Sequence, residues 1–230
     1  MAQNPTAAMI FAAGFGTRMG PLTADRPKPM VTLGGRPMID YAVEIAQSAG
    51  AGKIVANLHY HGDILARHLA PAGVALSWEE PDILETGGGL RAALPLLGAG
   101  PVYTLNPDAA WRGPNPLRHL APLWRPSEMD ALLLLIPRTH ARGYTGKGDF
   151  LPDQAGRLAR GPGLVYSGAQ IIKTDLLHGI KDKVFSLNKL WDVMGARGRL
   201  FGAAYPGEWC DVGTPEGLVR AEEMLGQADV

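Results

Sequence analysis

The sequence has few of the features that mark secreted, membrane-spanning or nucleic-acid-binding proteins. Its one cysteine, Cys210, allows no disulfide within the chain, so a reducing compartment such as the cytoplasm is expected. Residues 1–6 lack the basic and apolar blocks of a signal peptide, and no apolar run approaches the roughly 20 residues of a membrane span. Lys plus Arg and Asp plus Glu both number 22, and this zero net charge argues against a nucleic-acid partner.

The apolar pattern predicts an α/β fold with a mostly parallel central sheet. Apolar runs such as 7–12 and 131–136 are typical of buried strands, and helical patterns separate many of the strands. This order indicates βαβ units with helices on both faces of the sheet, in a single domain over residues 1–230. The expected strands are 7–12, 53–57, 74–78, 102–105, 131–136, 164–173 and 200–205, and the expected helices are 37–49, 62–69, 90–97, 114–124, 175–179, 187–195 and 215–225.

A glycine-rich stretch follows the first expected strand and carries the clearest sign of a binding site. Gly14, Gly16 and Gly20 come after the strand, with Arg18 among them and Lys28 further on between two prolines. Glycine allows backbone N–H groups to approach an anion closely, and nearby cations neutralise its charge. The stretch therefore predicts a phosphate site.

The glycine spacing excludes two common nucleotide-binding loops. A dinucleotide fingerprint needs G-x-G-x-x-G, but the third glycine here comes one residue too late. No acidic residue stands at the expected place after the second strand, so a hydride-transferring enzyme is disfavoured. No G-x-x-x-x-G-K-[ST] string occurs, and the P-loop is excluded as well.

Two longer strings carry a family resemblance. The first is G-x-G-T-R-M-x-P-L-T with a later P-K-P, over residues 14–29, and the second is W-x-D-V-G-T-P, over residues 209–215. Both resemble the sugar-1-phosphate nucleotidylyltransferases, and the resemblance extends from residue 9 to residue 225. It implies a Rossmann-like nucleotidyltransferase fold with a nucleotide-binding part near 7–110 and a sugar-phosphate part near 111–225.

The resemblance implies an enzyme that joins a nucleoside triphosphate to a sugar-1-phosphate and releases pyrophosphate. A phosphate monoester is already ionised near neutral pH, so this nucleophile needs no general base. The task is to neutralise and position two polyanions. By resemblance, Arg18 stabilises the leaving pyrophosphate, and Lys28 bridges the α-phosphate and the sugar phosphate.

The resemblance also implies which residues hold the nucleotide. Backbone N–H groups of the glycine-rich loop are expected to bind the β- and γ-phosphates, and the segment 85–89 is expected to hold the base. The three glycines of that segment could equally form a flexible connection, and Glu85 is a candidate contact to base or ribose. The predicted nucleotide-binding set is Ala12, Ala13, Gly14, Gly16, Thr17, Arg18, Lys28, Glu85, Gly87 and Gly88.

Asp108 and Asp211 are the metal ligands that the resemblance implies, with Mg²⁺ as the cofactor. Asp108 follows the strand 102–105, and ligands of open α/β sheets bind at such carboxyl ends. Two carboxylates with phosphate oxygens and waters suit Mg²⁺. The family's usual glycine before the first carboxylate is Pro107 here, which removes an N–H donor. His59 and His61 flank a tyrosine and are interpreted as loop residues rather than ligands.

The sugar is expected to contact four residues by the same resemblance. Gly148 and Asp149 fall where the family closes a segment over the sugar, although an ordinary turn would also explain them. Gly168 lies in an expected strand where the absence of a Cβ would let a sugar ring approach the backbone, and Asn106 stands near the expected metal carboxylate.

The extent of the sequence and two short motifs favour one group of substrates. The chain has no β-helix repeats after the W-x-D-V-G-T-P string, and with E-T-G-G-G and G-D-F it is similar to the N-acetylmuramate-1-phosphate uridylyltransferases of cell-wall recycling. The mannose-1-phosphate guanylyltransferases, and a non-catalytic nucleotide-sugar sensor, are the alternatives. The partners expected are these small molecules, with neither nucleic acid nor membrane, and nothing in the sequence indicates an oligomeric state.

Overall fold

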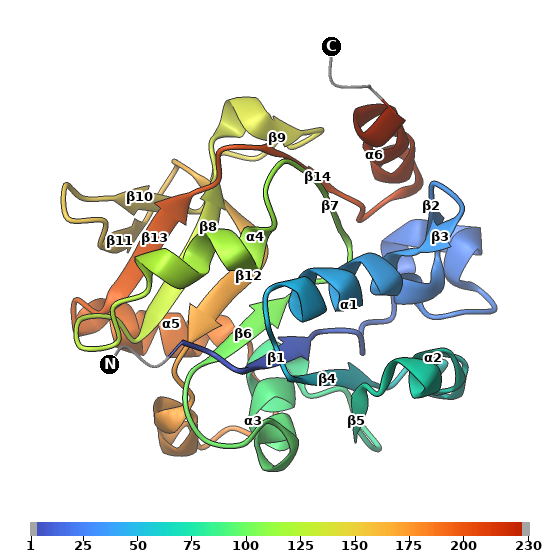
Figure 1. Ribbon diagram of the computed structural model, residues 1–230, viewed down its shortest axis with the longest axis horizontal. Helices are drawn as coiled ribbons and strands as arrows, with labels where there is room; N and C mark the ends of the chain where they lie inside the picture. The colour runs from blue at the N-terminus through green and yellow to red at the C-terminus, as the bar shows by residue number, and fades with distance from the viewer. Residues whose placement is uncertain (1–3, 227–230) are drawn as a thin grey trace.

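A seven-stranded sheet forms the centre of the protein (Figure 1) in the computed structural model, which describes residues 4–226. Its strands are β1 (Ala7–Ile10), β4 (Lys53–Leu58), β5 (Ala75–Trp78), β6 (Val102–Leu105), β8 (Ala131–Ile136), β12 (Val165–Ile172) and β13 (Leu200–Ala204). The order across the sheet is β13-β8-β12-β6-β1-β4-β5. All neighbours are parallel except β12, which is antiparallel to β6 and β8. The predicted α/β class with a mostly parallel sheet is confirmed.

The apolar run of β8 is explained by burial on both faces of the sheet. Leu132 and Leu134 contact the apolar core on one face, whereas Leu133 and Leu135 contact the core on the other. Successive side chains of a strand point to opposite faces, so a strand covered on both sides needs apolar residues at every position. The run therefore shows no alternation.

Helices cover both faces, as predicted. The first core joins the sheet to α1 (Met38–Ser48), α2 (Gly62–Leu69) and α4 (Pro116–Leu120). The second joins it to α3 (Glu85–Leu97) and α5 (Leu187–Ala196). Short 3₁₀ helices complete the chain, and they are η1 (Thr17–Thr23), η2 (Lys28–Met30), η3 (Ala70–Ala72), η4 (Ala121–Leu123), η5 (Arg138–His140) and η6 (Asp175–Gly179).

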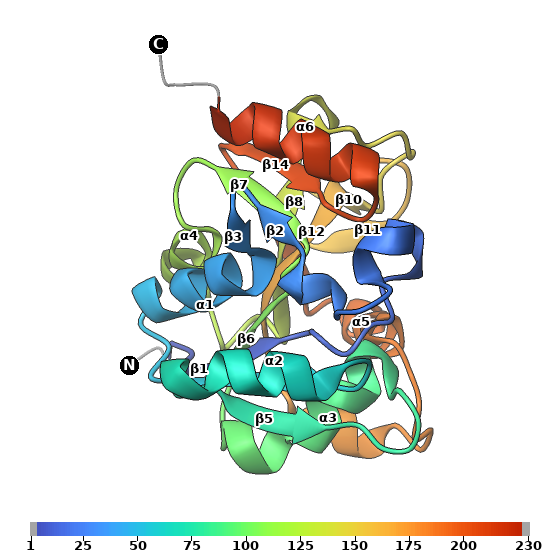
Figure 2. The same cartoon turned by 90° about the vertical axis from the view of Figure 1, so that its right-hand side faces the viewer.

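A second, smaller sheet lies at one end of the molecule and was not expected from the sequence. It has the order β7-β14-β9, from β7 (Ala109–Arg112), β14 (Glu208–Asp211) and β9 (Ala141–Arg142). The last helix, α6 (Pro215–Gly226), lies over β14 (Figure 2). The two remaining strand pairs are β2 (Thr32–Leu33) with β3 (Arg36–Pro37), and β10 (Phe150–Pro152) with β11 (Leu158–Arg160).

One element boundary corrects the sequence prediction in a way that matters for the site. The glycines at 87–89 are not a loop before a helix, because α3 begins at Glu85 and includes them. A Cβ at Gly87 would lie 2.4 Å from the Phe185 ring, and one at Gly88 would lie 2.6 Å from the carbonyl oxygen of Lys183. Close packing against segment 183–185 selects these glycines, and it overrides their poor helix propensity.

Other boundaries differ less. The expected helix 114–124 divides into α4 and η4, and the expected helix 175–179 is the 3₁₀ helix η6. Within residues 4–226, no helix has the length and apolar character that a membrane crossing requires. The predicted single domain also included residues 1–3 and 227–230, which lie outside the described residues, and its division near residue 110 stays a prediction.

Candidate active site

Strand pairing explains how the two predicted metal carboxylates meet. Asp108 immediately precedes β7 and Asp211 ends β14, and in this antiparallel pair Asp211 lies opposite Ala109. The Val212 N–H also donates to the Asp108 carbonyl oxygen at 2.8 Å. Residues distant in sequence thus become direct neighbours at the end of a two-stranded ribbon.

Each carboxylate has a cation beside it. Lys28 Nζ lies 2.5 Å from Asp108 Oδ2, and the lysine side chain is only 11% exposed. Arg18 Nη1 lies 3.9 Å from Asp211 Oδ2, and both of these side chains are much more exposed. Gly213 makes the second approach possible, because a Cβ there would lie 2.7 Å from Asp211 Oδ2 and 2.9 Å from the Arg18 guanidinium. The four predicted charged residues therefore gather in one place.

The surroundings of Asp211 shift the pKa of its carboxyl. Burial raises the pKa of the Asp211 carboxyl above its usual value, the charge of Asp108 raises it further, and Lys28 and Arg18 lower it. Burial and a neighbouring like charge both disfavour the ionised form. The ionised form of Asp211 is therefore less favoured here than in water, with burial as the largest cause.

The phosphate loop is shaped around the lysine. Gly16 has φ +65°, and a Cβ there would lie 2.7 Å from Lys28 Cβ, so both conformation and packing require glycine. Thr23 Oγ1 donates to the Gly16 and Gly20 carbonyl oxygens, at 3.1 and 3.2 Å, which fixes the turn around η1. Within residues 4–226, the N–H groups of residues 13–16 donate to no other group of the protein. They are available to an anion, as predicted from the glycines.

A cavity of about 280 Å³, which we call the loop pocket, opens beside this loop. It brings together predicted residues from three segments, namely Ala13, Gly14, Glu85, Asn106 and Asp108. Its other lining residues are Phe11, Asn57, Glu79, Ile83 and Thr86. The pocket therefore extends from the loop and a metal carboxylate to the start of α3.

Three predicted nucleotide contacts do not fit this geometry. The N–H groups of Gly87 and Gly88 both donate to the Phe185 carbonyl oxygen, at 2.8 and 3.0 Å, and neither residue lines the loop pocket. The Ala12 N–H donates to Asn57 Oδ1 at 2.7 Å. These N–H groups are already paired within the protein and do not face the loop pocket as free donors, and the contact of these residues with a nucleotide stays a prediction. Thr17, also in the predicted set, is exposed as the first residue of η1.

The four predicted sugar contacts separate into two places. Gly168, at φ +87°, forms an irregularity in β12, and a Cβ there would lie 2.8 Å from Asn106 Cβ. This pair lies beside the loop pocket, since Asn106 lines it.

Gly148 and Asp149 lie outside that lining. A Cβ at Gly148 would meet the Gly163 backbone, and Asp149 Oδ2 accepts from the Tyr166 N–H at 2.8 Å. Internal contacts therefore account for both residues, and their contact with a sugar stays a prediction.

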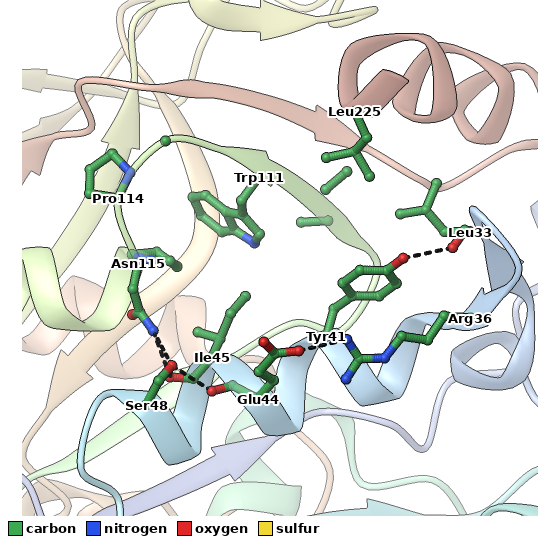
Figure 3. Close-up of a pocket in the computed structure, with 14 residues that line it drawn as sticks. Leu33, Arg36, Tyr41, Glu44, Ile45, Ser48, Trp111, Pro114, Asn115 and Leu225 are labelled. Carbon is green, nitrogen blue, oxygen red and sulfur yellow. Dashed lines mark hydrogen bonds and ion pairs between the residues drawn. The ribbon is translucent and has the colours of Figure 1, made fainter. Parts of the chain in front are cut away.

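A second cavity, the α1 groove, is larger, at about 360 Å³, but contains none of the predicted residues (Figure 3). Several of its polar groups are paired with neighbouring groups of the protein. Tyr41 Oη donates to the Leu33 carbonyl oxygen at 2.8 Å, and Arg36 Nη1 donates to Glu44 Oε2 at 2.6 Å. Asn115 Nδ2 donates to the Ile45 carbonyl oxygen at 2.9 Å. Nothing in this groove indicates a reaction.

Sequence reasoning missed Asn57 and Glu79 in the loop pocket. Glu79 is fully buried, and Asn57 is 4% exposed. The available signal was a charged residue directly after a strand pattern, at the edge of the sheet where ligands bind. Among the described residues, no group of three or more His, Cys, Asp and Glu side chains could hold a metal.

Comparisons with known proteins identify the family of this chain. A family model described as "MobA-like NTP transferase domain" matches residues 8–150. The N-acetylmuramate alpha-1-phosphate uridylyltransferase of Caulobacter vibrioides is 38% identical, over 99% of this chain and 100% of the relative. That of Neisseria meningitidis serogroup B is 33% identical, over 95% and 98%.

A solved structure shows the same fold. UDP-glucose pyrophosphorylase complexed with UDP-glucose superposes with a TM-score of 0.75 over 98% of this chain and 100% of that one, at 18% identity. The predicted family is therefore confirmed by a matching family model, by full-length relatives and by the fold. The chain belongs to the MobA-like NTP transferases, and it is a sugar-1-phosphate nucleotidylyltransferase.

Proposed function

We propose that this enzyme transfers a uridylyl group from UTP to N-acetylmuramate-1-phosphate in an Mg²⁺-dependent reaction. The observation that carries the chemistry is the meeting of Lys28, Asp108, Asp211 and Arg18 beside the loop pocket. The names of its two uridylyltransferase relatives support the choice of base and sugar.

The proposed roles follow from charge and position. The N–H groups of residues 13–16 hold the β- and γ-phosphates, and Arg18, exposed at the mouth of the site, stabilises the departing pyrophosphate. Lys28 is held by its packing on Gly16 and by Asp108, so its ammonium has little freedom. It orients the α-phosphate toward the incoming phosphate oxygen, which attacks in line while pyrophosphate leaves.

The chemistry of the two carboxylates fits Mg²⁺. Burial and the charge of Asp108 make the ionised form of Asp211 less favourable, and a divalent cation bound between the two carboxylates would favour it. Mg²⁺ favours hard oxygen ligands and usually takes one or two carboxylates, with substrate phosphates and waters completing its shell. When bound, it would neutralise phosphate charge, and Asp108 and Asp211 would hold it.

The test is a matrix of substrates with pyrophosphate release as the readout. UTP, GTP, dTTP and CTP are each paired with N-acetylmuramate-1-phosphate, glucose-1-phosphate and mannose-1-phosphate, with and without EDTA. We expect the highest kcat/KM for UTP with N-acetylmuramate-1-phosphate, and loss of turnover with EDTA that Mg²⁺ restores. A preference for GTP and mannose-1-phosphate would overturn the proposed substrates, and undiminished turnover in EDTA would overturn the metal.

A further inference from the structure

A buried carboxylate in the loop pocket has no role in the chemistry described so far. Glu79 follows β5 and is 0% exposed. Among residues 4–226, no lysine or arginine forms an ion pair with it. Instead, Asn57 Nδ2 donates to Oε1 and the Leu84 N–H donates to Oε2, each at 2.7 Å. A buried charge is costly unless such donors satisfy it, so this arrangement constrains everything attached to it.

These bonds continue to the phosphate loop. Asn57 is on β4, and its Oδ1 accepts from the Ala12 N–H at 2.7 Å. One chain of hydrogen bonds thus runs from Ala12, at the start of the loop, through Asn57 and Glu79 to Leu84, directly before α3. It connects the wall that faces the phosphates with the wall that begins at Glu85.

The donor and acceptor at each position are forced. The Asn57 amide must present oxygen to an N–H and nitrogen to a carboxylate, so its orientation is fixed. Position 79 must accept twice, which a carboxylate does and an amide does not. Gly89 packs closely against both side chains and limits their movement, because a Cβ there would lie 2.5 Å from Glu79 Oε1 and 3.0 Å from Asn57 Nδ2.

We propose that Glu79 and Asn57 are positioning residues that fix the separation between the phosphate loop and the start of α3, and thereby set the affinity for the nucleoside triphosphate. This inference rests on the proposed placement of the nucleotide in the loop pocket. Neither residue touches the reacting phosphorus. Their loss therefore raises KM for the nucleotide and leaves kcat and the KM for the sugar phosphate nearly unchanged.

Exchanging the amide and the carboxylate between positions 57 and 79 tests this chain of hydrogen bonds. Glu79→Gln leaves either the Asn57 amide or the Leu84 N–H facing an NH₂ group, and Asn57→Asp sets two carboxylates against each other. We expect each single variant to raise KM for the preferred nucleotide about 10-fold, the effect of one lost hydrogen bond to a charged group. The double variant N57D/E79Q restores every donor and acceptor, because the new carboxylate accepts from Ala12 and from the new amide, whose oxygen accepts from Leu84.

The double variant is expected to recover KM to within about twofold of the parent, since complementarity is restored. Asp130→Asn is the matched control. Asp130 is also buried and accepts from Arg199 and Lys173, but it precedes β8, which lies four strands from β4 and five from β5 in the sheet. It should lower the melting temperature without changing KM for the nucleotide.

Two results would overturn the proposal that Glu79 and Asn57 position the nucleotide site. One is a double variant with the parent's melting temperature but a raised KM, and the other is single variants that lose only stability, as the control does. If the single variants do not fold, the double variant decides alone by the same criteria. The assays use whichever nucleotide the substrate matrix selects, so a preference for GTP would refute the proposed base without affecting this test.

Discussion

The loop pocket and the α1 groove are both hollows of the same α/β framework, and they differ in how their polar groups are satisfied. In the larger α1 groove, hydroxyl, guanidinium and amide groups pair with neighbours in the chain. In the smaller loop pocket, the backbone N–H groups of the lining residues Ala13 and Gly14 have no partner among residues 4–226. Unpaired backbone donors, rather than volume, distinguish the pocket in which we propose that the nucleotide binds.

Two glycines of the phosphate loop also differ in what surrounds them. Gly14 lines the loop pocket, and a Cβ at that position would have nothing within 4 Å, whereas Gly16 lies against the Lys28 side chain. One glycine leaves room for a ligand and the other shapes the protein. If the two cavities differ in function as they differ in the pairing of their polar groups, substitutions at the proposed site should affect activity far more than substitutions in the α1 groove.

Asp108→Asn and Asp211→Asn should have the largest effect. Each removes a charge from the proposed Mg²⁺ site, and kcat/KM should fall about 10³-fold while the fold is retained. Pyrophosphate release over a range of Mg²⁺ concentrations checks this. Glu208→Gln, at the other end of β14, is the matched control and should retain most activity. Full activity in both aspartate variants would show that the metal assignment is wrong.

Lys28→Met should have the second-largest effect on activity. It keeps the length of the buried stem but removes the ammonium that lies against Asp108, and kcat should fall about 10²-fold. Single-turnover kinetics with saturating nucleotide separates this loss from weaker binding. An unchanged rate of the chemical step would mean that Lys28 only balances the charge of Asp108.

The two glycines give a matched pair. Gly16→Ala places a side chain at φ +65° against Lys28 and should cost about 1–2 kcal/mol of unfolding free energy. Gly14→Ala should leave stability within about 0.5 kcal/mol, because open space surrounds the site. It should nevertheless raise KM for the nucleotide. Denaturant unfolding and initial rates measure both variants, and equal losses of stability would contradict the assigned difference.

Asp211 gives a pH-dependent effect on stability. Its pKa is raised in the folded protein, chiefly by burial, so ionisation is less favourable there than in the unfolded chain. The free-energy cost of ionising Asp211 in the folded protein is absent when the pH is below the usual pKa near 3.8. This cost grows as the pH rises from that value through the raised pKa of the folded state. Asp211→Asn should therefore melt no lower than the parent at pH 7 without Mg²⁺. Its relative melting temperature should fall as the pH is lowered toward 3.5, and a variant less stable at pH 7 would contradict this sign.

The smallest effect on activity is expected in the α1 groove. Tyr41→Phe removes the hydroxyl that donates to the Leu33 carbonyl oxygen and should cost about 1 kcal/mol of stability. Turnover and both KM values should stay within about twofold of the parent. A large change in either KM would mean that the groove communicates with the reaction, and the contrast between the cavities would fail.

Much of the framework was predictable because it depends on local pattern. The boundaries of α2, β6 and β8 match the sequence prediction residue for residue, since each is set by a local pattern of apolar and flanking residues. The resemblance also identified Lys28, Asp108, Asp211 and Arg18, which do meet. Their proposed roles await the experiments above.

The errors share a cause, which is packing between distant segments. Sequence alone did not reveal that Phe185 would accept the N–H groups of Gly87 and Gly88 and so place both glycines inside α3. The pairing of β7 with β14 was likewise not predicted, because both strands are short and far apart in the chain. Close approach to another part of the chain explains Gly87 and Gly88, whereas their contact with a nucleotide stays a prediction.

The β7–β14 ribbon has a consequence for synthesis on the ribosome. Most of the large sheet can be translated before residue 208, but Asp211 emerges with the final strand and meets Asp108 only then. A nascent chain that has not reached residue 208 therefore has the loop and Asp108 but lacks the second carboxylate of the proposed metal site. With the proposed roles, such a chain could not yet hold Mg²⁺ between two aspartates.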